Sequence, residues 1–454
     1  MQLKSMDILE KHVIKQLSSG GFILALNTEA KIDGQAEAML QALHSRSTGG
    51  IKSHLKTLAE KGAENFMEKF YLGYGHKSIG DCGSATVFVE GISMLAAKAI
   101  QDWRLYSGQE ASTRYVDFSE QKFLNPAGTK EGEEILENWR KFYLDAQSPV
   151  REHLKKQFPK KDDEDQKIYD KAIIARAFDI TRSFLPAGAT TNVAWRMNFR
   201  QFADELMLLR HHPLKEIQDI AEKTEAALKE TYPSSFCQER FPNTEEYNKN
   251  WMQGKYYYKN DSAENFAMLY DNVDRKMLSE YKEILETRPM KTELPMAIAE
   301  CGTVAYEFLL DFGSFRDLQR HRAIVQRMPL LTLTHGFNQW YLNSLPEDLK
   351  KKTEEFLKSQ AEKIKKLDVS EEERQYYIAM GYLVPCRFSG DLKALVYLAE
   401  LRSTRFVHPT LVEQILKMIA SLKELFAKDG LVLHLDEEPN RFDVRRGEQD
   451  IMEK

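Results

Sequence analysis

The chain alternates between stretches in which apolar residues return every three or four positions and shorter stretches rich in β-branched and aromatic residues. Residues 51–70 follow the first pattern, which is typical of an amphipathic helix, and Gly73 is a natural place for it to end. Residues 85–90, ATVFVE, follow the second pattern and predict a strand. Residues 198–210 return to helical spacing with one apolar stripe. The sequence therefore predicts helices and strands mixed along the chain.

The composition changes after residue 232, where Pro, Ser, Asn and Tyr become frequent. A segment of this kind, residues 233–263, predicts a linker between two domains. Within it, three tyrosines follow Lys255, a combination that can stack on nucleic acid. We favour a packed, ordered connector over a nucleic-acid contact, because long structureless loops are uncommon in compact proteins.

Overall composition and charge limit the classes of function. The chain has 454 residues, of which 42% are hydrophobic and 29% charged, as expected for a globular protein with two domains. The formal net charge of -5 gives no overall attraction for nucleic acid, so an anionic ligand has to be held by a local group of arginines. No apolar run is long enough to span a bilayer, and the first residues lack the apolar core of a signal peptide. We expect a cytoplasmic protein with no membrane and no nucleic-acid partner.

The cysteines give no sign of a metal site or of a disulfide framework. Cys82, Cys237, Cys301 and Cys386 are scattered, without the close pairs that zinc sites use. We expect reduced cysteines and no bound metal.

The stretch from Asp102 to Tyr115, DWRLYSGQEASTRY, has the character of a ligand-binding loop. Ser112 and Arg114 are two residues apart, so their side chains point the same way in an extended backbone. A hydroxyl beside a guanidinium suits a phosphate, and Glu110 adds an acceptor to the same face. Without a neighbouring base, Ser112 is better suited to binding a phosphate than to nucleophilic attack. On composition alone, a solvated polar loop is the simpler interpretation.

This stretch resembles the signature of the flavin-dependent thymidylate synthases, in which Arg-His-Arg is followed by Ser, Asn-Glu, Ser and Arg-Tyr. Asp102, Trp103 and Arg104 stand in place of Arg-His-Arg, and Gln109 stands in place of Asn. A true Arg-His-Arg occurs far downstream at residues 320–322, where the rest of the motif is missing. One motif is thus divided between two places in the chain. The part kept in register at the first place comprises Ser107, Glu110, Ser112, Arg114 and Tyr115.

A glycine-rich turn before the predicted strand is similar to the family's Gly-His-x-Ser/Thr turn. It holds His76 and Ser78. By itself, a histidine after Gly-Tyr-Gly is more often a structural turn residue. The resemblance instead implies a role in the site for both residues.

A third segment is similar to the family's pattern of Arg before Leu-Pro, then Asn-x-Arg, then Leu-Arg at a helix end. Arg182 precedes the Leu-Pro pair, Asn198 and Arg200 form Asn-x-Arg, and Arg210 closes the helix. The spacing from Asn198 to Arg210 is one residue longer than in the family pattern. Read without the resemblance, the segment is a core helix flanked by surface arginines.

The second half of the chain repeats the first in outline. Residues 305–319 are similar to the helix before Asp102, and residues 382–402 are similar to the Leu-Pro to Leu-Arg segment. With the resemblance, this predicts an α+β fold made of two tandem repeats of the family's fold, each helix-rich with a mixed or antiparallel sheet. We expect the first repeat at residues 1–232, the linker at 233–263 and the second repeat at 264–454.

The resemblance implies an FAD-dependent thymidylate synthase, which methylates dUMP to dTMP reductively with methylenetetrahydrofolate and NADPH as co-substrates. It also implies a homodimer of two-repeat chains that imitates the family's homotetramer. Two alternatives stay open: a flavin enzyme acting on another pyrimidine nucleotide, and a decayed flavin- or nucleotide-binding protein without turnover. The resemblance assigns the nucleotide to Glu110, Ser112, Arg114, Arg182 and Arg210, FAD to Ser78, Asn198, Arg200, Arg320, His321 and Arg322, and catalysis to Arg182, Arg210 and His76.

Overall fold

A computed structural model describes residues 11–28, 30, 32–113, 116, 118–436, 438 and 442–448. The chain divides into two compact units: unit 1 comprises Met1–Val116 and Ala189–Tyr256, and unit 2 comprises Asp117–Gly188 and Tyr257–Lys454. These units do not follow the predicted repeat limits, because residues 117–188 pack with the second half of the chain. The limits of the duplication itself stay a prediction. The predicted α+β class is confirmed, with helices and three sheets that are mostly antiparallel.

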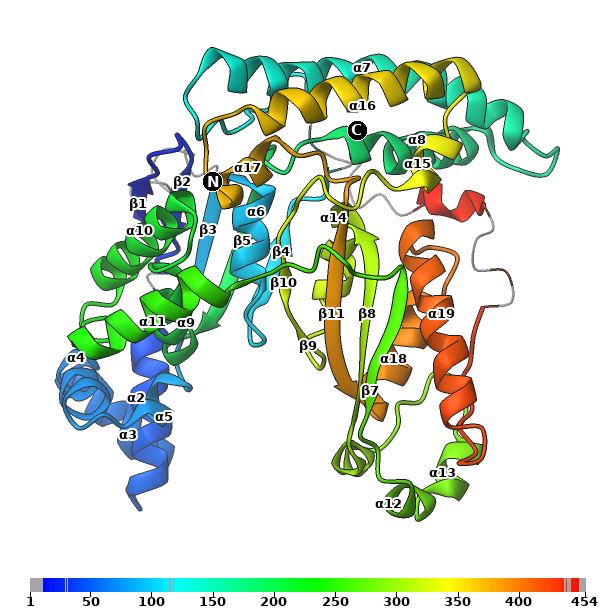
Figure 1. Ribbon diagram of the computed structural model, residues 1–454. Helices are drawn as coiled ribbons and strands as arrows, with labels where there is room; N and C mark the ends of the chain where they lie inside the picture. The colour runs from blue at the N-terminus through cyan, green and yellow to red at the C-terminus, as the bar shows by residue number, and fades with distance from the viewer. Residues whose placement is uncertain are drawn as a thin grey trace. The chain divides into compact units, whose positions relative to one another are not determined.

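Unit 1 is built on a five-stranded antiparallel sheet in the order β1-β2-β3-β5-β4 (Figure 1). The predicted strand at 85–90 lies inside β3, whose side chains alternate between buried and more exposed positions. The register of β3 against β5 shifts at a bulge between Glu90 and Ile92. The strands are β1 (Val13–Gln16), β2 (Phe22–Ala25), β3 (Ser84–Ser93), β4 (Ser107–Glu110) and β5 (Thr190–Asn198).

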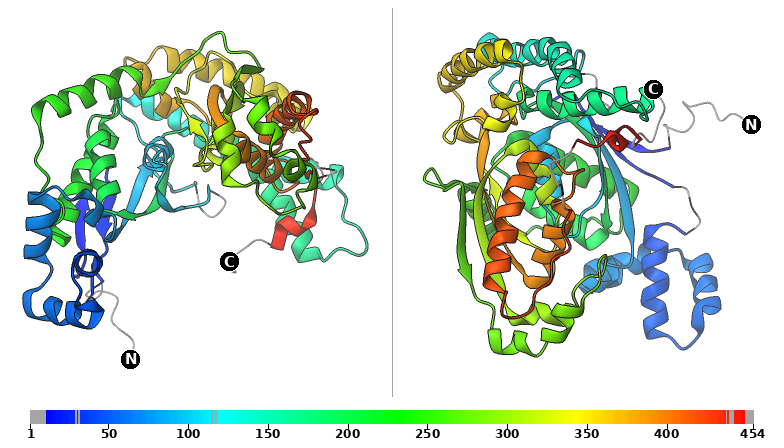
Figure 2. Two further views of the ribbon diagram at one scale, coloured as in Figure 1. Left: turned by 90° about the horizontal axis from the view of Figure 1, so that it is seen from below. Right: turned by 90° about the vertical axis from the view of Figure 1, so that its right-hand side faces the viewer.

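Two helices of unit 1 begin directly at the ends of central strands. Ser93 ends β3 and caps α6 with its side chain, and Asn198 ends β5 and caps α9 in the same way. Helices α2 and α3 form a hairpin beside the sheet (Figure 2). The helices are α2 (Gly34–Arg46), α3 (Gly50–Lys61), α4 (Glu64–Phe66), the π-helix η1 (Met67–Gly73), α5 (Lys77–Gly80), α6 (Met94–Gln101), α9 (Phe199–Leu209), α10 (Lys215–Thr231) and α11 (Pro242–Lys255).

One sequence expectation in unit 1 needs correction. The helix predicted over 51–70 is broken, because Gly62 has φ of 66° and ends α3 before α4 and η1 begin. Residues 233–263, predicted to be a packed and ordered connector, include the regular helix α11 at residues 242–255.

Unit 2 has a four-stranded antiparallel sheet in the order β7-β8-β11-β9 and a small parallel pair, β10-β6. Figure 1 shows α18 and α19 beside this sheet, with both helices in contact with its strands or with each other. The strands are β6 (Tyr257–Tyr258), β7 (Phe266–Asp271), β8 (Thr303–Asp311), β9 (Val325–Gln326), β10 (Met328–Pro329) and β11 (Leu383–Asp391).

The remaining part of unit 2 is a helical layer in which α7 packs against α8 and α16 (Figure 1). The buried Trp139 of α7 donates its indole N–H to the carbonyl of Tyr377, at 3.0 Å. The helices are α7 (Lys130–Gln157), α8 (Gln166–Thr181), η3 (Arg182–Phe184), α12 (Arg275–Ser279), α13 (Lys282–Thr287), η4 (Met296–Cys301), α14 (Phe312–Gln319), α15 (Gln339–Asn343), α16 (Glu347–Lys365), α17 (Glu371–Arg374), η5 (Gln375–Tyr377), α18 (Leu392–Arg402), α19 (Pro409–Leu425) and η6 (Val444–Glu448).

Elements of the two halves have matching lengths. The series η3, β5, α9 and the series η5, β11, α18 have 3, 9 and 11 residues each, with equal gaps between the elements. Helices α6 and α14 have 8 residues each, and each follows a central strand that supplies its cap. Within unit 2, the loops after η3 and η5 pair in antiparallel fashion, with a bridge between Pro186 and Ala379.

Across the described residues, no helix is long and apolar enough to cross a membrane.

Candidate functional site

The predicted site residues are divided between the two units. Arg182 and residues 320–322 belong to unit 2. Arg114 lies outside the described residues. The other predicted residues, His76, Ser78, Glu110, Ser112, Asn198, Arg200 and Arg210, belong to unit 1.

In unit 1, the glycine-rich turn presents His76 to solvent. Gly75 adopts φ of 67°, which allows the chain to turn there, and both His76 and Ser78 are exposed. The ring of His76 stacks beside that of Tyr74, with 6.2 Å between centroids and 27° between the ring planes. Nearby, Arg200 pairs with Asp81 at 2.9 Å between Nε and Oδ1. The turn is therefore accessible.

Asn198, predicted to contact the cofactor, has a structural role in unit 1. Its side-chain oxygen accepts a hydrogen bond from the backbone N–H of Gln201 at 2.9 Å and caps α9. Asp391 caps α18 in the same manner by accepting from the backbone N–H of Ala394 at 2.8 Å. The shared cap explains why a short polar residue stands at both positions.

Glu110 is held in a buried ion pair. Its carboxylate lies 2.9 Å from Nζ of Lys98, and the two side chains are 2% and 1% exposed. Gln101 closes the triangle: it accepts from Lys98 at 2.7 Å and donates to Glu110 at 2.9 Å. The group joins β4 to α6. Ser112 is exposed, beyond the end of this strand.

Arg210 is also engaged within unit 1. Its guanidinium donates to both carboxylate oxygens of Glu245 on α11, with 2.8 Å for the Nε contact, and lies 3.4 Å from Glu225. The hydrogen bonds from Arg210, and a further one with His211, hold the pKa of Glu245 below its usual value. A carboxylate therefore occupies the fork that the resemblance assigns to the nucleotide.

In unit 2, four arginines gather around one carboxylate, that of Asp317. Burial raises the pKa of Asp317, but the positive charges of Arg320, Arg182, Arg402 and Arg316 outweigh it and leave the pKa below its usual value. The arginines come from α14 with its C-cap, from η3 and from α18. Distant segments of the chain thus build one cationic group.

His321 lies at the edge of this group and is 7% exposed. Arg402 donates from Nε to His321 Nε2 at 2.7 Å and from a terminal nitrogen to the carbonyl of Asp317 at 2.8 Å. Burial and the charge of Arg402 lower the pKa of His321 to about 3. The imidazole is therefore neutral at neutral pH, and because Nε2 accepts, its proton is on Nδ1.

Arg182 has unused hydrogen-bonding capacity. Among the described residues, none accepts a hydrogen bond from its buried Nε, although Asp179 and Asp311 add negative charge nearby. Arg320 is 56% exposed and Arg322 is exposed, so the group opens to solvent. Such an arrangement suits an anionic ligand.

Sequence reasoning missed Asp317 and Arg316, and it did not assign Arg402 to the site. A signal for them existed in the comparison of the two equal helices: α6 has Lys98 and Ala99 where α14 has Arg316 and Asp317. Within the described residues, no group of three His, Cys, Asp or Glu side chains is arranged to hold a metal ion.

Comparison with known proteins defines the class of the first half. Residues 28–234 match the family model described as thymidylate synthase complementing protein, Thy1. The chain therefore contains a Thy1-family domain.

Among individual relatives, the chain is 26% identical over 431 residues to a "UPF0159 protein" of Chlamydia pneumoniae, covering 81% of this chain and 80% of that protein. It is 25% identical over 450 residues to a "UPF0159 protein" of Thermoplasma acidophilum, covering 81% and 87%. A flavin-dependent thymidylate synthase of Pyrococcus furiosus is 26% identical over 149 residues, 31% of this chain and 54% of that protein.

Proposed function

We propose that the protein is an FAD-dependent methyltransferase of the thymidylate synthase type, which converts dUMP to dTMP with methylenetetrahydrofolate and NADPH. The observation that carries this proposal is the cationic group around Asp317, in a chain that also contains a Thy1-family domain. The group combines Arg182 with Arg320, two residues that the family resemblance assigns to the nucleotide and to FAD.

The side chains of unit 2 fit an anionic cofactor. The buried Nε of Arg182 lacks an acceptor among the described residues, and Arg320 and Arg322 are exposed to incoming ligand. Arg320, His321 and Arg322 would hold FAD, as the resemblance implies. Bound there, FAD would supply the hydride that completes the methyl group.

The residues of this chain contribute binding and electrostatics. Arg182 and Arg402 provide preorganised positive charge, which stabilises negative charge on a pyrimidine nucleotide as it develops. Neutral His321 can donate one hydrogen bond from Nδ1 without adding charge, since Arg402 occupies Nε2. Such a site needs no covalent nucleophile from the protein.

A tandem duplication underlies this proposal. It is supported by the equal lengths and spacings of the η3–β5–α9 and η5–β11–α18 series and by the equal helices α6 and α14. We also propose a homodimer, in which two chains supply four repeats in imitation of a homotetramer. A stable monomer in light scattering would contradict the homodimer.

A different pyrimidine nucleotide is the second candidate substrate. The specific observation is the burial of Glu110 against Lys98 and Gln101, which removes from the surface an acceptor that the resemblance assigns to dUMP. A substrate that does not use this acceptor fits unit 1 better.

The decisive experiment follows NADPH oxidation with and without dUMP and methylenetetrahydrofolate, while dTMP is measured separately. Formation of dTMP only with all components supports thymidylate synthesis. Flavin-linked NADPH oxidation that another pyrimidine nucleotide stimulates, without dTMP, supports the second candidate. Purified protein that neither binds flavin nor oxidises NADPH contradicts both.

A variant at Arg182 tests the site. Replacing Arg182 with Gln removes one charged contact to the nucleotide and should weaken its binding by roughly ten- to a hundredfold. Arg196, on the same chain but on β5 and 3.3 Å from the Ser84 hydroxyl, offers a matched control. An equal loss in Arg182→Gln and Arg196→Gln would refute the assignment.

A further inference from the structure

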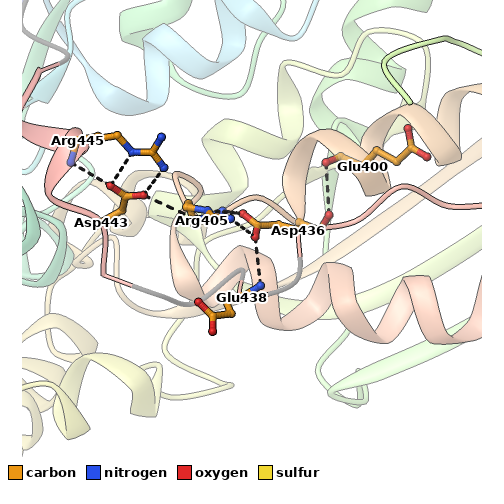
Figure 3. Close-up of polar contacts among 7 residues, drawn as sticks. Glu400, Arg405, Asp436, Glu438, Asp443 and Arg445 are labelled. Carbon is orange, nitrogen blue, oxygen red and sulfur yellow. Dashed lines mark hydrogen bonds and ion pairs between the residues drawn. The ribbon is translucent and has the colours of Figure 1, made fainter. Parts of the chain in front are cut away.

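The segment after α19 crosses the end of α18 and is held there by charged contacts (Figure 3). We call it the C-terminal strap, defined by the described residues 431–436, 438 and 442–448. All of it belongs to unit 2. The strap meets α18 and the loop that follows it at two points.

The first point is Glu400, in the last turn of α18. Its carboxylate accepts from the backbone N–H of His434 at 2.8 Å and from Arg288 at 3.2 Å. Arg288 is 6% exposed and donates to the carbonyl of Val432 at 2.9 Å. The imidazole of His434 in turn lies 2.9 Å from the carbonyl of Arg288. Strap and helix end are therefore joined by a closed set of hydrogen bonds.

The second point is Arg405, just beyond α18. Its guanidinium donates to both oxygens of Asp436, with 2.6 Å for the Nε contact, and its backbone N–H donates to the same carboxylate at 3.2 Å. The side chain of Asp436 is 9% exposed. Asp443 lies 3.9 Å from Arg405 and pairs with Arg445 at 2.7 Å, as Figure 3 shows. A bidentate pair of this kind fixes orientation as well as distance.

Arg402 lies between these two points in the sequence. Its guanidinium donates to His321 Nε2 at 2.7 Å and to the carbonyl of Asp317 at 2.8 Å. The strap binds the side chain of Glu400 on one side of Arg402 in the sequence, and both the guanidinium and the backbone N–H of Arg405 on the other side.

We propose that the C-terminal strap is a positioning element for the cationic group: Asp436, acting through Arg405 and Arg402, holds His321 in the orientation in which it meets an anionic flavin. Asp436 is a positioning residue, since it contacts neither His321 nor the proposed ligand position. The identity of the ligand in this inference rests on the proposed function. The contact between Arg402 and His321 is independent of that function.

Unit 1 has a comparable contact near the end of α9. Helix α11, which follows α10 in the chain, packs against α9, and its Glu245 accepts hydrogen bonds from Arg210 at both carboxylate oxygens. In unit 1 the returning carboxylate holds the arginine directly after the helix, whereas in unit 2 it holds Arg405. The difference leaves Arg402 available to His321. In each unit, a carboxylate from a later segment thus binds an arginine near the end of a helix.

A double-mutant cycle tests the chain of contacts. Flavin affinity is measured by fluorescence for the full-length protein, for Asp436→Asn, for Arg402→Ala and for the double variant. Asp436→Asn should weaken flavin binding about tenfold, as loss of a supporting partner often does. In the Arg402→Ala background it should add less than twofold, because both changes interrupt one path. Additive losses would overturn the proposal. Asp436→Glu should restore part of the affinity.

Histidine NMR separates this test from the proposed function. In the unmodified protein, His321 should stay neutral, with its proton on Nδ1, from about pH 5 to about pH 8. This range includes the pKa of about 6.5 at which an ordinary histidine titrates. In Asp436→Asn, its signal should titrate toward the ordinary histidine range of about 6.5. His321→Gln assigns the signal. An unchanged His321 signal in Asp436→Asn would overturn the proposal even if flavin does not bind at all.

A matched control uses an exposed ion pair on α19. Glu413 pairs with Lys417 at 3.0 Å and is 57% exposed. Glu413→Gln removes one carboxylate from the same unit without touching the strap. It should change neither flavin affinity nor the His321 signal. If it lowers flavin affinity as much as Asp436→Asn does, the effect is one of general charge and the positioning role is refuted.

Discussion

Replacing Lys98 with Met should destabilise unit 1 strongly. Lys98 and Glu110 are 1% and 2% exposed and lie 2.9 Å apart, so removing one charge leaves the other buried with Gln101 as its remaining partner in the triangle. Loss of one member of a buried ion pair costs about 3–5 kcal/mol. Met keeps the length of the lysine stem, so the change in packing is small. The predicted loss is therefore electrostatic.

The double variant Lys98→Met, Glu110→Gln supplies the sharp comparison. With both charges removed, no uncompensated charge is buried, and most of the stability should return. Hydrogen exchange of the amides of α6 measures the local free energy of opening and avoids assuming that the two units unfold together. If the double variant opens as readily as Lys98→Met alone, the reasoning is wrong. Recovered stability with lost nucleotide binding would show that Glu110 also serves a ligand.

Three further changes have expected outcomes. Burial lowers the pKa of His212 to about 3, so unfolding takes up a proton between about pH 3 and 6.5, and stability falls as pH falls through this window. His212→Gln should flatten the pH dependence by up to about 1.4 kcal/mol per pH unit, which denaturant titrations at several pH values can check. In Gly447→Ala, the new Cβ would lie 2.3 Å from the carbonyl of Ile168, so hydrogen exchange should become faster in residues 442–448. Asp317→Asn removes the central carboxylate of the cationic group, so inorganic pyrophosphate should bind roughly five- to thirtyfold more tightly. Pyrophosphate should therefore raise the melting temperature of this variant more than that of the unmodified protein. An equal rise in melting temperature in both proteins would contradict this expectation.

Local sequence pattern predicted the strands and helices that carry the site. The β-prone run at 85–90 is part of β3, and the helical spacing over 198–210 corresponds to α9. The same reasoning failed where a single backbone angle decides the outcome, as at Gly62, whose positive φ ends a helix that the apolar pattern would continue. Periodicity reports which face is buried, but it does not report where the backbone turns.

The candidate site was predicted in part, because its charges are balanced over long distances in the sequence. Arg182 and Arg320 were recognisable from their motifs. Arg320 follows Asp317 by three residues, but the relation of Arg182 to Asp317 depends on packing of segments more than a hundred residues apart, which no local pattern encodes. The contact between Arg210 and Glu245 could not be predicted for the same reason, because Glu245 lies on α11, in a segment whose composition is typical of a linker.

The two halves differ in where the carboxylate that pairs with the basic residue of the helix is located. At matching positions of the equal helices, Lys98 and Ala99 of α6 correspond to Arg316 and Asp317 of α14. Lys98 finds its carboxylate on the following strand, at Glu110, and the pair is sealed from water. In unit 2 the carboxylate is on the helix itself and is 29% exposed. In a sealed pair the two buried charges compensate each other and are not accessible to a ligand, whereas an open carboxylate shared among several guanidinium groups leaves positive charge available to an anion. On this argument, the arginines of unit 2 are the ones able to meet an anionic cofactor.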